Sequence, residues 1–208
     1  MINNKEQEIW FENAWKIREE QIYPALFGTV QTQIYTLTES MFAHIGSRHI
    51  DPRWLTNGVL IAQSQNNSWI YLSSGLSNPW GQQDTHDQDK QISGIGFELW
   101  LESKQHDPRF IKYLQWVIIW QLLIATGVID EPLIDIGDRI VLPETYTQGV
   151  KDYALLVNQT SDARRQFLLP SGKVDLLQLI PINSQEAQIA TEQGGHFLIE
   201  QLKTKKQP

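Results

Sequence analysis

The chain has 208 residues, a formal charge of −7 and no cysteine, and 41% of its residues are hydrophobic. This length fits one domain with a full core, and the missing cysteines exclude disulfides, thiolate nucleophiles and cysteine-bound zinc. The acidic balance argues against a nucleic-acid partner, because a phosphate-binding protein clusters Lys and Arg. The one basic cluster here is KTKK, within the polar tail 203–208.

The sequence shows no membrane or secretion signal. The N-terminus, MINNKEQEIWF, is polar and lacks the apolar core of a signal peptide, so a cytoplasmic protein is expected. The apolar segment 110–129 is interrupted by Lys112, Gln115 and Gln121, whereas a membrane span needs about 18 or more consecutive apolar residues. We therefore expect a buried core helix here and no membrane partner.

The first 54 residues predict one helix and a less certain second element. An apolar stripe over 4–23 predicts the helix, which Pro24 and Gly28 are expected to end. Residues 30–38 fit either a strand or a continuation of that helix. Residues 44–54 read as a loop.

Three strands are expected next. Residues 59–64 and 69–74 predict a hairpin joined by QNNS. Residues 94–103, GIGFELWLES, alternate clearly, and the two glycines suggest a bulge or a close approach by another backbone. One face carries Ile95, Phe97, Leu99 and Leu101; the other carries Gly94, Gly96, Glu98, Trp100 and Glu102.

The second half predicts a central helix followed by strands. An Asp-Pro pair at 107–108 is a good helix start, and the helix should run to about Thr126. It is apolar nearly all round, which indicates a central position. Short strands are predicted at 139–142 and 153–157, and a hairpin at 166–182 with a Pro-Ser-Gly turn.

The C-terminal part predicts two helices. Asn183 and Glu186 form a capping box that should start a helix running to about Gln193. Two glycines at 194–195 break it before a last short helix over 196–202. The element order predicts an α+β fold: a single compact domain with a mixed, mostly antiparallel sheet packed by helices.

The polar run GQQDTHDQDKQ, residues 81–91, lies between the second and third of these expected strands. It raises the question of a metal or catalytic loop. Counting from Asp87 places Glu98 at position 12 of a calcium loop, but position 6 is Ile92 where glycine is required. No nucleophile elbow, P-loop or dinucleotide fingerprint is present, so no enzyme activity is expected. A solvated loop is the simplest interpretation, and a metal-dependent enzyme remains the rival, using Asp84, His86, Asp87 and Asp89.

Glu98 lies in the middle of an expected strand. If a helix covers its face, the carboxylate must be paired with a donor. It is then either a structural carboxylate or an acceptor for the backbone of a bound partner.

Three segments in this order resemble the suppressor of fused domain family: WIYLSSGLSNPWG (69–81), SGIGFELWL (93–101) and VDLLQLIPINSQE (174–186). The segment IGDRIVLP also fits, so the resemblance spans about residues 45–202, within one domain over 1–208. It implies a compact α+β domain without known catalysis or cofactor that acts by binding proteins. The animal members hold a transcription factor by embracing a short peptide, partly through strand pairing, and use a second domain that is absent here.

Within the resemblance, Trp80 matches an aromatic residue that holds the peptide in the animal proteins. Asp89 lies close to their acidic position, although Lys90 could align there instead. Bacterial members are often proposed to be immunity proteins. The sequence therefore predicts a bacterial, cytoplasmic protein-binding domain, best fitted to neutralising a toxin of competing bacteria, with a homo-oligomer subunit as a further alternative and the oligomeric state open. The expected partner-binding residues are Trp80, Asp84, Asp87, Asp89 and Glu98.

Overall fold

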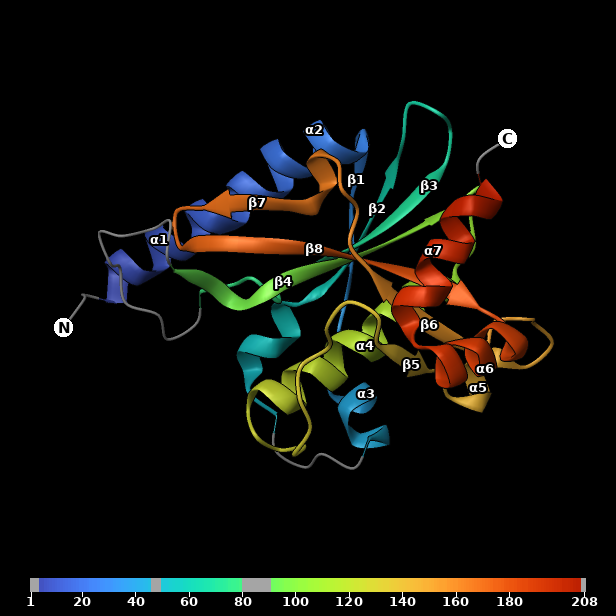
Figure 1. Cartoon of the computed structure of the whole chain (residues 1–208). Coiled ribbons are helices and arrows are strands. Elements are labelled where there is room, and N and C mark those ends of the chain that lie inside the picture. Colours follow the sequence, from blue (N-terminus) through green and yellow to red (C-terminus); the bar gives the residue numbers. More distant parts are fainter. Residues whose placement is uncertain (1–3, 46–49, 80–90, 207–208) are drawn as a thin grey trace.

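The computed structural model describes residues 4–45, 50–79 and 91–206. One eight-stranded sheet runs in the order β1-β2-β3-β4-β8-β6-β5, and β7 pairs with β8 (Figure 1). Among the described strands, β4 and β8 pair in parallel and all other pairs are antiparallel, which confirms the predicted α+β class and mixed sheet. The strands are β1 (Thr29–Thr36), β2 (Gly58–Gln63), β3 (Trp69–Ser74), β4 (Ile92–Ser103), β5 (Arg139–Val141), β6 (Ala154–Asn158), β7 (Gln166–Leu169) and β8 (Gly172–Ile182).

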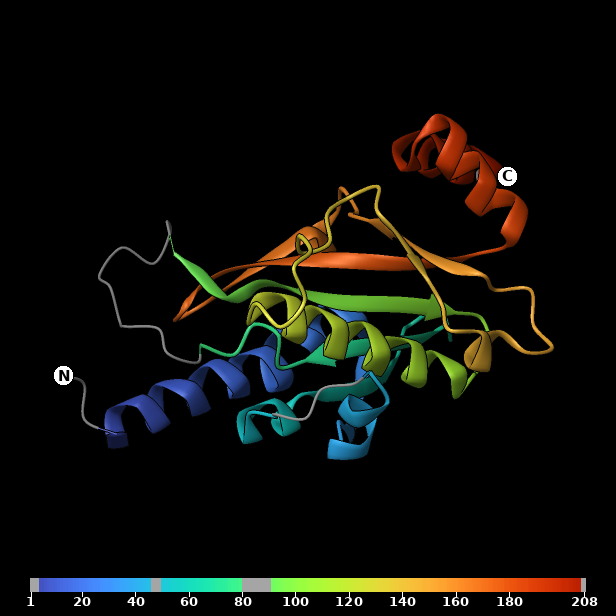
Figure 2. The same cartoon turned by 90° about the horizontal axis from the view of Figure 1, so that it is seen from below.

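Helices cover both faces of the sheet (Figures 1 and 2). The α-helices are α1 (Asn4–Lys16), α2 (Tyr23–Phe27), α3 (Glu39–His44), α4 (Arg109–Ala125), α5 (Glu144–Thr147), α6 (Ser184–Gln193) and α7 (Gly195–Lys206). A π-helical segment, η1 (Ile17–Ile22), joins α1 to α2, and the 3₁₀ turns are η2 (Pro52–Thr56) and η4 (Ala163–Arg165).

The strand alternation divides the core between the two faces. Phe97, Leu99 and Leu101 of β4 point into the larger cluster, which is built around α4. Trp100, next to them in the chain, points into a smaller cluster with Tyr23 and other residues of α2 and the sheet. The face predicted from the alternation in β4 is therefore confirmed.

Helix α4 is the central element of the larger cluster. Twelve of its side chains are buried, so the expectation of a buried core helix is confirmed. The side chain of Gln121, which interrupts the apolar run, accepts a hydrogen bond from the backbone of Ile134 at 3.1 Å. Within the described part of the chain, no helix has the length and hydropathy needed to cross a membrane.

Of the two residues expected to end the N-terminal helix, Pro24 does not end it and Gly28 does, so the helix runs on to Phe27. The helix changes to π hydrogen bonding at Ile17–Ile22, and the N–H of Tyr23 reaches back to the carbonyl of Arg18. Pro24 then occupies the first turn of α2, where its missing N–H interrupts no bond. Gly28, at φ +92°, provides the actual end.

Both glycines of β4 have the positive φ angles that favour glycine, +59° for Gly94 and +98° for Gly96. The register between β4 and β8 shifts between Ile92 and Phe97, which is the bulge that the glycines predicted. A Cβ on Gly94 would lie 2.3 Å from the carbonyl oxygen of Leu76, so the predicted close backbone approach is also confirmed.

Other local predictions have mixed outcomes. The hairpin β7–β8 and the capping box are confirmed; Glu186 N donates to Asn183 Oδ1 and Asn183 N to Glu186 Oε2, both at 3.0 Å. Of residues 30–38, left open between strand and helix, residues 30–36 belong to β1. The region expected to be only loop contains η2, and α7 extends past the expected end at 202 to Lys206.

Candidate functional site

Four of the five expected partner-binding residues, Trp80, Asp84, Asp87 and Asp89, lie outside the described residues, as does His86. The fifth, Glu98, is described and has 0% exposure. The structure thus defines the two chain segments that flank residues 80–90. We call them the stem: residues 73–79, from the end of β3 onward, and residues 91–98, which include the start of β4.

The two sides of the stem are bonded to each other close to where residues 80–90 begin and end. Ile95 N donates to the carbonyl oxygen of Leu76 at 3.0 Å. Ser93 Oγ donates to the carbonyl oxygen of Ser77 at 2.7 Å. Gly94 packs against the same backbone, where a side chain would collide. These contacts fix the separation of the two chain ends from which residues 80–90 extend.

The turn between β7 and β8 supports the stem from the other side. Ser171 Oγ lies 2.5 Å from Ser93 Oγ, and Lys173 N donates to the carbonyl oxygen of Gln91 at 2.8 Å. A Cβ on Gly172 would lie 2.4 Å from that same carbonyl oxygen. A turn distant in sequence therefore holds the second side of the stem in place.

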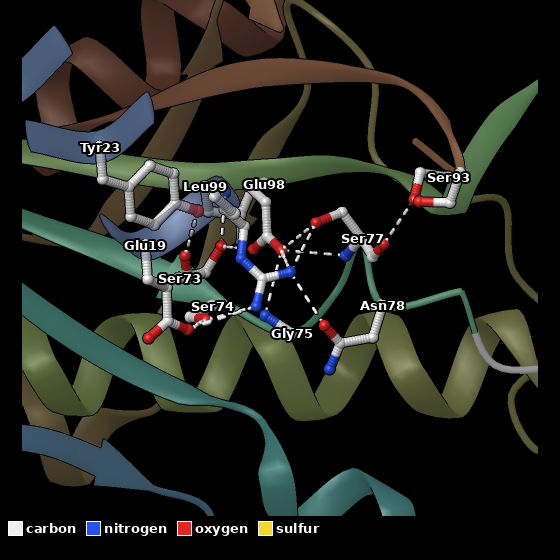
Figure 3. A network of polar contacts seen from close by, with 12 residues as sticks. Glu19, Tyr23, Ser73, Ser74, Gly75, Ser77, Asn78, Ser93, Glu98 and Leu99 are labelled. Carbon is white, nitrogen blue, oxygen red and sulfur yellow. Dashed lines mark hydrogen bonds and ion pairs between the residues drawn. The ribbon is translucent and has the colours of Figure 1, made fainter. Parts of the chain in front are cut away.

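Glu98 organises the first side of the stem (Figure 3). Its Oε1 accepts from the backbone N of Gly75 at 3.0 Å, from the backbone N of Ser77 at 2.9 Å and from Ser77 Oγ at 2.7 Å. Its Oε2 accepts a short hydrogen bond from Ser73 Oγ. Because a buried carboxylate is costly without donors, this arrangement fixes the turn after β3 around one side chain.

Arg18 of η1 crosses the same space and is also fully buried. Its Nη1 donates to Asn78 Oδ1 at 2.8 Å and to Ser77 Oγ at 2.9 Å, and lies 3.5 Å from Glu98 Oε1. Its Nη2 donates to Ser74 Oγ at 2.7 Å. One guanidinium thereby ties the N-terminal helix to the stem and neutralises the buried carboxylate.

Tyr23 closes the network on the side of α2. Its hydroxyl donates to the carbonyl oxygen of Ser73 at 2.6 Å. Burial raises the pKa of the Tyr23 phenol well above its ordinary value, and the nearby Glu98 carboxylate raises this pKa further. The phenol therefore stays protonated and keeps its donor role at neutral pH.

The network meets the condition that the sequence set for Glu98: a helical segment covers its face and supplies a donor. Described residues of this chain supply donors to both carboxylate oxygens, which is the arrangement expected of a structural carboxylate. Its predicted role as an acceptor for a bound partner stays a prediction. Arg18 was not singled out from the sequence, because IREEQI is charged and resembles an exposed helical turn. The carboxylate in the middle of β4 was the signal that a donor from elsewhere in the chain should pair with it.

Among residues 4–45, 50–79 and 91–206, no group of three His, Asp or Glu side chains is arranged to hold a metal ion. The acidic run proposed for a metal-dependent enzyme lies outside these residues, so that alternative stays untested. What the described residues provide is a hydrogen-bonded support for the two chain segments that flank residues 80–90.

The fold and the stem define an α+β domain that presents a long polar segment from two bonded strand ends. The sequence profile of the family described as "Suppressor of fused protein" matches residues 55–208, most of the chain. The chain belongs to this family. No curated protein matches the sequence.

Solved structures have the same fold at low sequence identity. A suppressor of fused homologue from Neisseria gonorrhoeae FA 1090 is 13% identical with a TM-score of 0.59, covering 95% of this chain and 88% of that one. A chain of the Sufu-Fu complex is 18% identical with a TM-score of 0.52, covering 81% and 84%. Drosophila Suppressor of fused is 21% identical with a TM-score of 0.49 over 64% of this chain, which spans 33% of that protein.

Proposed function

We propose that this chain is a non-enzymatic protein-binding domain in which residues 80–90 recognise the partner. Trp80, Asp84, Asp87 and Asp89 would make the contacts, and Glu98 would act indirectly by holding the stem. The observation that carries the proposal is the buried network of Arg18, Glu98 and three serines, which fixes both ends of a polar acidic segment.

The family supports a binding role. One of the structures with a similar fold is a chain of the Sufu-Fu complex, so this fold occurs in a protein–protein assembly. The rigid stem fits that role, because fixing the ends of a recognition segment lowers the conformational entropy lost on binding.

The charge of the chain supports a basic partner. Three aspartates fall within six residues of a protein with a net charge of −7. A basic protein, such as a nuclease toxin, would be attracted over long range and would associate faster. The bacterial source, the immunity role and the cytoplasmic location remain predictions.

The test uses the partner recovered by pull-down with the full chain from its native cell. The variant Asp84→Asn/Asp87→Asn/Asp89→Asn should lower the association rate constant by about tenfold, because three attractive charges are lost. The wild-type rate should fall as salt rises. A matched control, Asp130→Asn/Glu131→Gln/Glu192→Gln, changes the net charge equally at exposed residues elsewhere and should have a much smaller effect.

Binding that does not depend on salt, or an equal loss in both triple variants, would contradict recognition by residues 80–90. Metal analysis of the purified protein addresses the enzyme alternative. A stoichiometric ion that is lost in Asp87→Ala together with an activity would favour the metal-dependent enzyme over the binding domain.

A further inference from the structure

Among the described strands, β1 lies at one edge of the sheet and pairs with β2 alone. Proteins usually protect such an edge with charged side chains, proline or a very short strand, because its free backbone groups can pair with another chain. β1 has eight residues, TVQTQIYT, with no charge and no proline. Of the usual protections, β1 has a bulge: Gln31, Thr32 and Gln33 lie opposite the single residue Ile61.

The hydrogen bonds between β1 and β2 show which backbone groups of β1 point away from β2. Leu37 N donates to the carbonyl oxygen of Asn57, so Leu37 points toward β2. In an antiparallel ladder the direction alternates, so Tyr35 also points toward β2 while Ile34 and Thr36 point outward. Gln115 Nε2 contacts the carbonyl oxygens of Tyr35 and Thr36, at 3.1 and 3.2 Å. The N–H and C=O of Ile34 are thus directed toward the open edge.

The hydrophobic side chains of β1 are only partly covered by the rest of the protein. Val30 and Ile34 pack against the cluster under α2, and Tyr35 packs against the cluster around α4, yet all three are only half-buried. A further strand beside β1 would cover both groups. The other side chains of β1 are exposed, and they are exclusively Thr and Gln: Thr29, Gln31, Thr32, Gln33 and Thr36.

The chain segments next to β1 in the sequence and in the sheet are uncharged as well, and the charged residues Asp162 and Arg164, which line a pocket with Gly28, are paired with each other. Residues 24–38 contain no Asp, Glu, Lys, Arg or His, and neither do residues 54–79, which include β2 and β3. Two copies of the chain each carry a charge of −7 and repel each other elsewhere. At the edge formed by β1, two copies can approach without bringing like charges together. A basic partner would meet no excess of negative charge at this edge.

We propose that the outer edge of β1 pairs antiparallel with β1 of a second copy of this chain, giving a two-fold dimer with a continuous sheet. A two-fold axis brings the same surface of both copies together, and β1 suits it because Thr–Thr and Gln–Gln pairs are compatible across antiparallel strands. Two strands, β2 and β3, separate β1 from β4, so the dimer leaves the stem free. This pairing does not depend on partner binding.

The test is the mass of the purified full chain by sedimentation over a range of concentrations. The wild type should reach a mass near twice 24.0 kDa. Gln31→Lys/Gln33→Lys places like charges across the edge and should raise the dissociation constant of the dimer by about tenfold or more. The control Gln188→Lys/Gln193→Lys makes the same charge change at exposed residues of α6 and should leave dimerisation unchanged.

A wild type that stays monomeric at all concentrations would overturn the proposal. A dimer that both lysine variants weaken equally would also overturn it, as would a dimer that neither variant weakens. A cysteine placed near the middle of β1 gives a second readout, since the chain has no other thiol. Under mild oxidation Thr32→Cys should form a disulfide-linked dimer, because residues opposite each other on antiparallel strands are close enough. The control Val141→Cys, at an exposed residue of β5 on the opposite edge of the sheet, should not.

Discussion

The two faces of the sheet are stabilised in different ways. The face under α4 is packed almost entirely by apolar side chains, and the buried polar side chains of α4, Gln115 and Gln121, contact backbone groups. The face under η1 and α2 contains an apolar cluster beside a fully buried ion pair, Arg18 and Glu98, with serines and a tyrosine around it. Apolar packing stabilises a compact fold and tolerates many combinations of side chains. Hydrogen bonds have fixed directions, so a buried polar network specifies the geometry of one particular segment. The polar face is the one that holds the stem.

Removing one partner of the buried pair should give the largest loss of stability. Arg18→Ala leaves the Glu98 carboxylate buried without its cation and leaves Asn78 and two serines without donors. We expect a loss of about 3–5 kcal/mol in the free energy of unfolding. Urea denaturation of both proteins measures it, and a loss below about 1 kcal/mol would show that the pair is not needed for folding.

A cavity on the apolar face should lower the free energy of unfolding somewhat less than Arg18→Ala does. It should also leave partner binding unchanged. Leu114 is fully buried in the cluster around α4. Leu114→Ala should lower the free energy of unfolding by about 3 kcal/mol through lost apolar contacts. Because Leu114 belongs to the apolar cluster around α4 and makes none of the hydrogen bonds of the polar network, partner binding by the folded protein should be unchanged. A loss of partner affinity in this variant, measured at a temperature where it remains folded, would contradict the different roles assigned to the two faces of the sheet.

The smallest effect concerns Tyr23 and depends on pH. The pKa of its phenol is raised in the folded state, so its contribution to stability is complete below the unfolded value near pH 10 and is lost as pH rises through the folded pKa. At pH 8, Tyr23→Phe should lower the free energy of unfolding by about 1 kcal/mol, since the hydrogen bond to Ser73 is lost.

The difference between wild type and Tyr23→Phe should then shrink above pH 10. Burial also raises the pKa of Tyr113, to about 12, and that of Tyr71. These tyrosines are present in both proteins, so the comparison isolates Tyr23. A difference that stays constant from pH 8 to pH 11.5 would contradict its place in the network.

Local patterns in the sequence predicted most of the elements. The alternation in β4, the paired glycines, the capping box and the apolar helix each reflect forces between residues close in the chain. One local signal was missed: Asp51 precedes Pro52 as Asp107 precedes Pro108, and both aspartates accept from the backbone N two residues on, at 2.9 and 3.0 Å. The same pattern that predicted α4 thus also marked η2.

The candidate site depended on contacts that local patterns do not contain. Arg18 lies 80 residues before Glu98 in the chain, and its sequence neighbours are charged, so nothing nearby distinguishes it from an exposed residue. The π-helical segment that places it also depends on packing against the sheet. The sequence could indicate that Glu98 needs a donor but could not select which one, because that choice is made by the tertiary fold.

Hydrogen exchange in the stem tests most directly whether the polar face holds residues 80–90 in place. The variant Arg18→Met/Glu98→Gln removes both charges together, so it should stay folded with a smaller loss than Arg18→Ala. We predict that its amides at Ser77 and Ile95 exchange at least about tenfold faster than in the wild type, while those of Leu60 and Leu72 in the central strands keep their protection. Unchanged exchange at Ser77 and Ile95 would show that the apolar packing alone fixes the stem and would contradict the account.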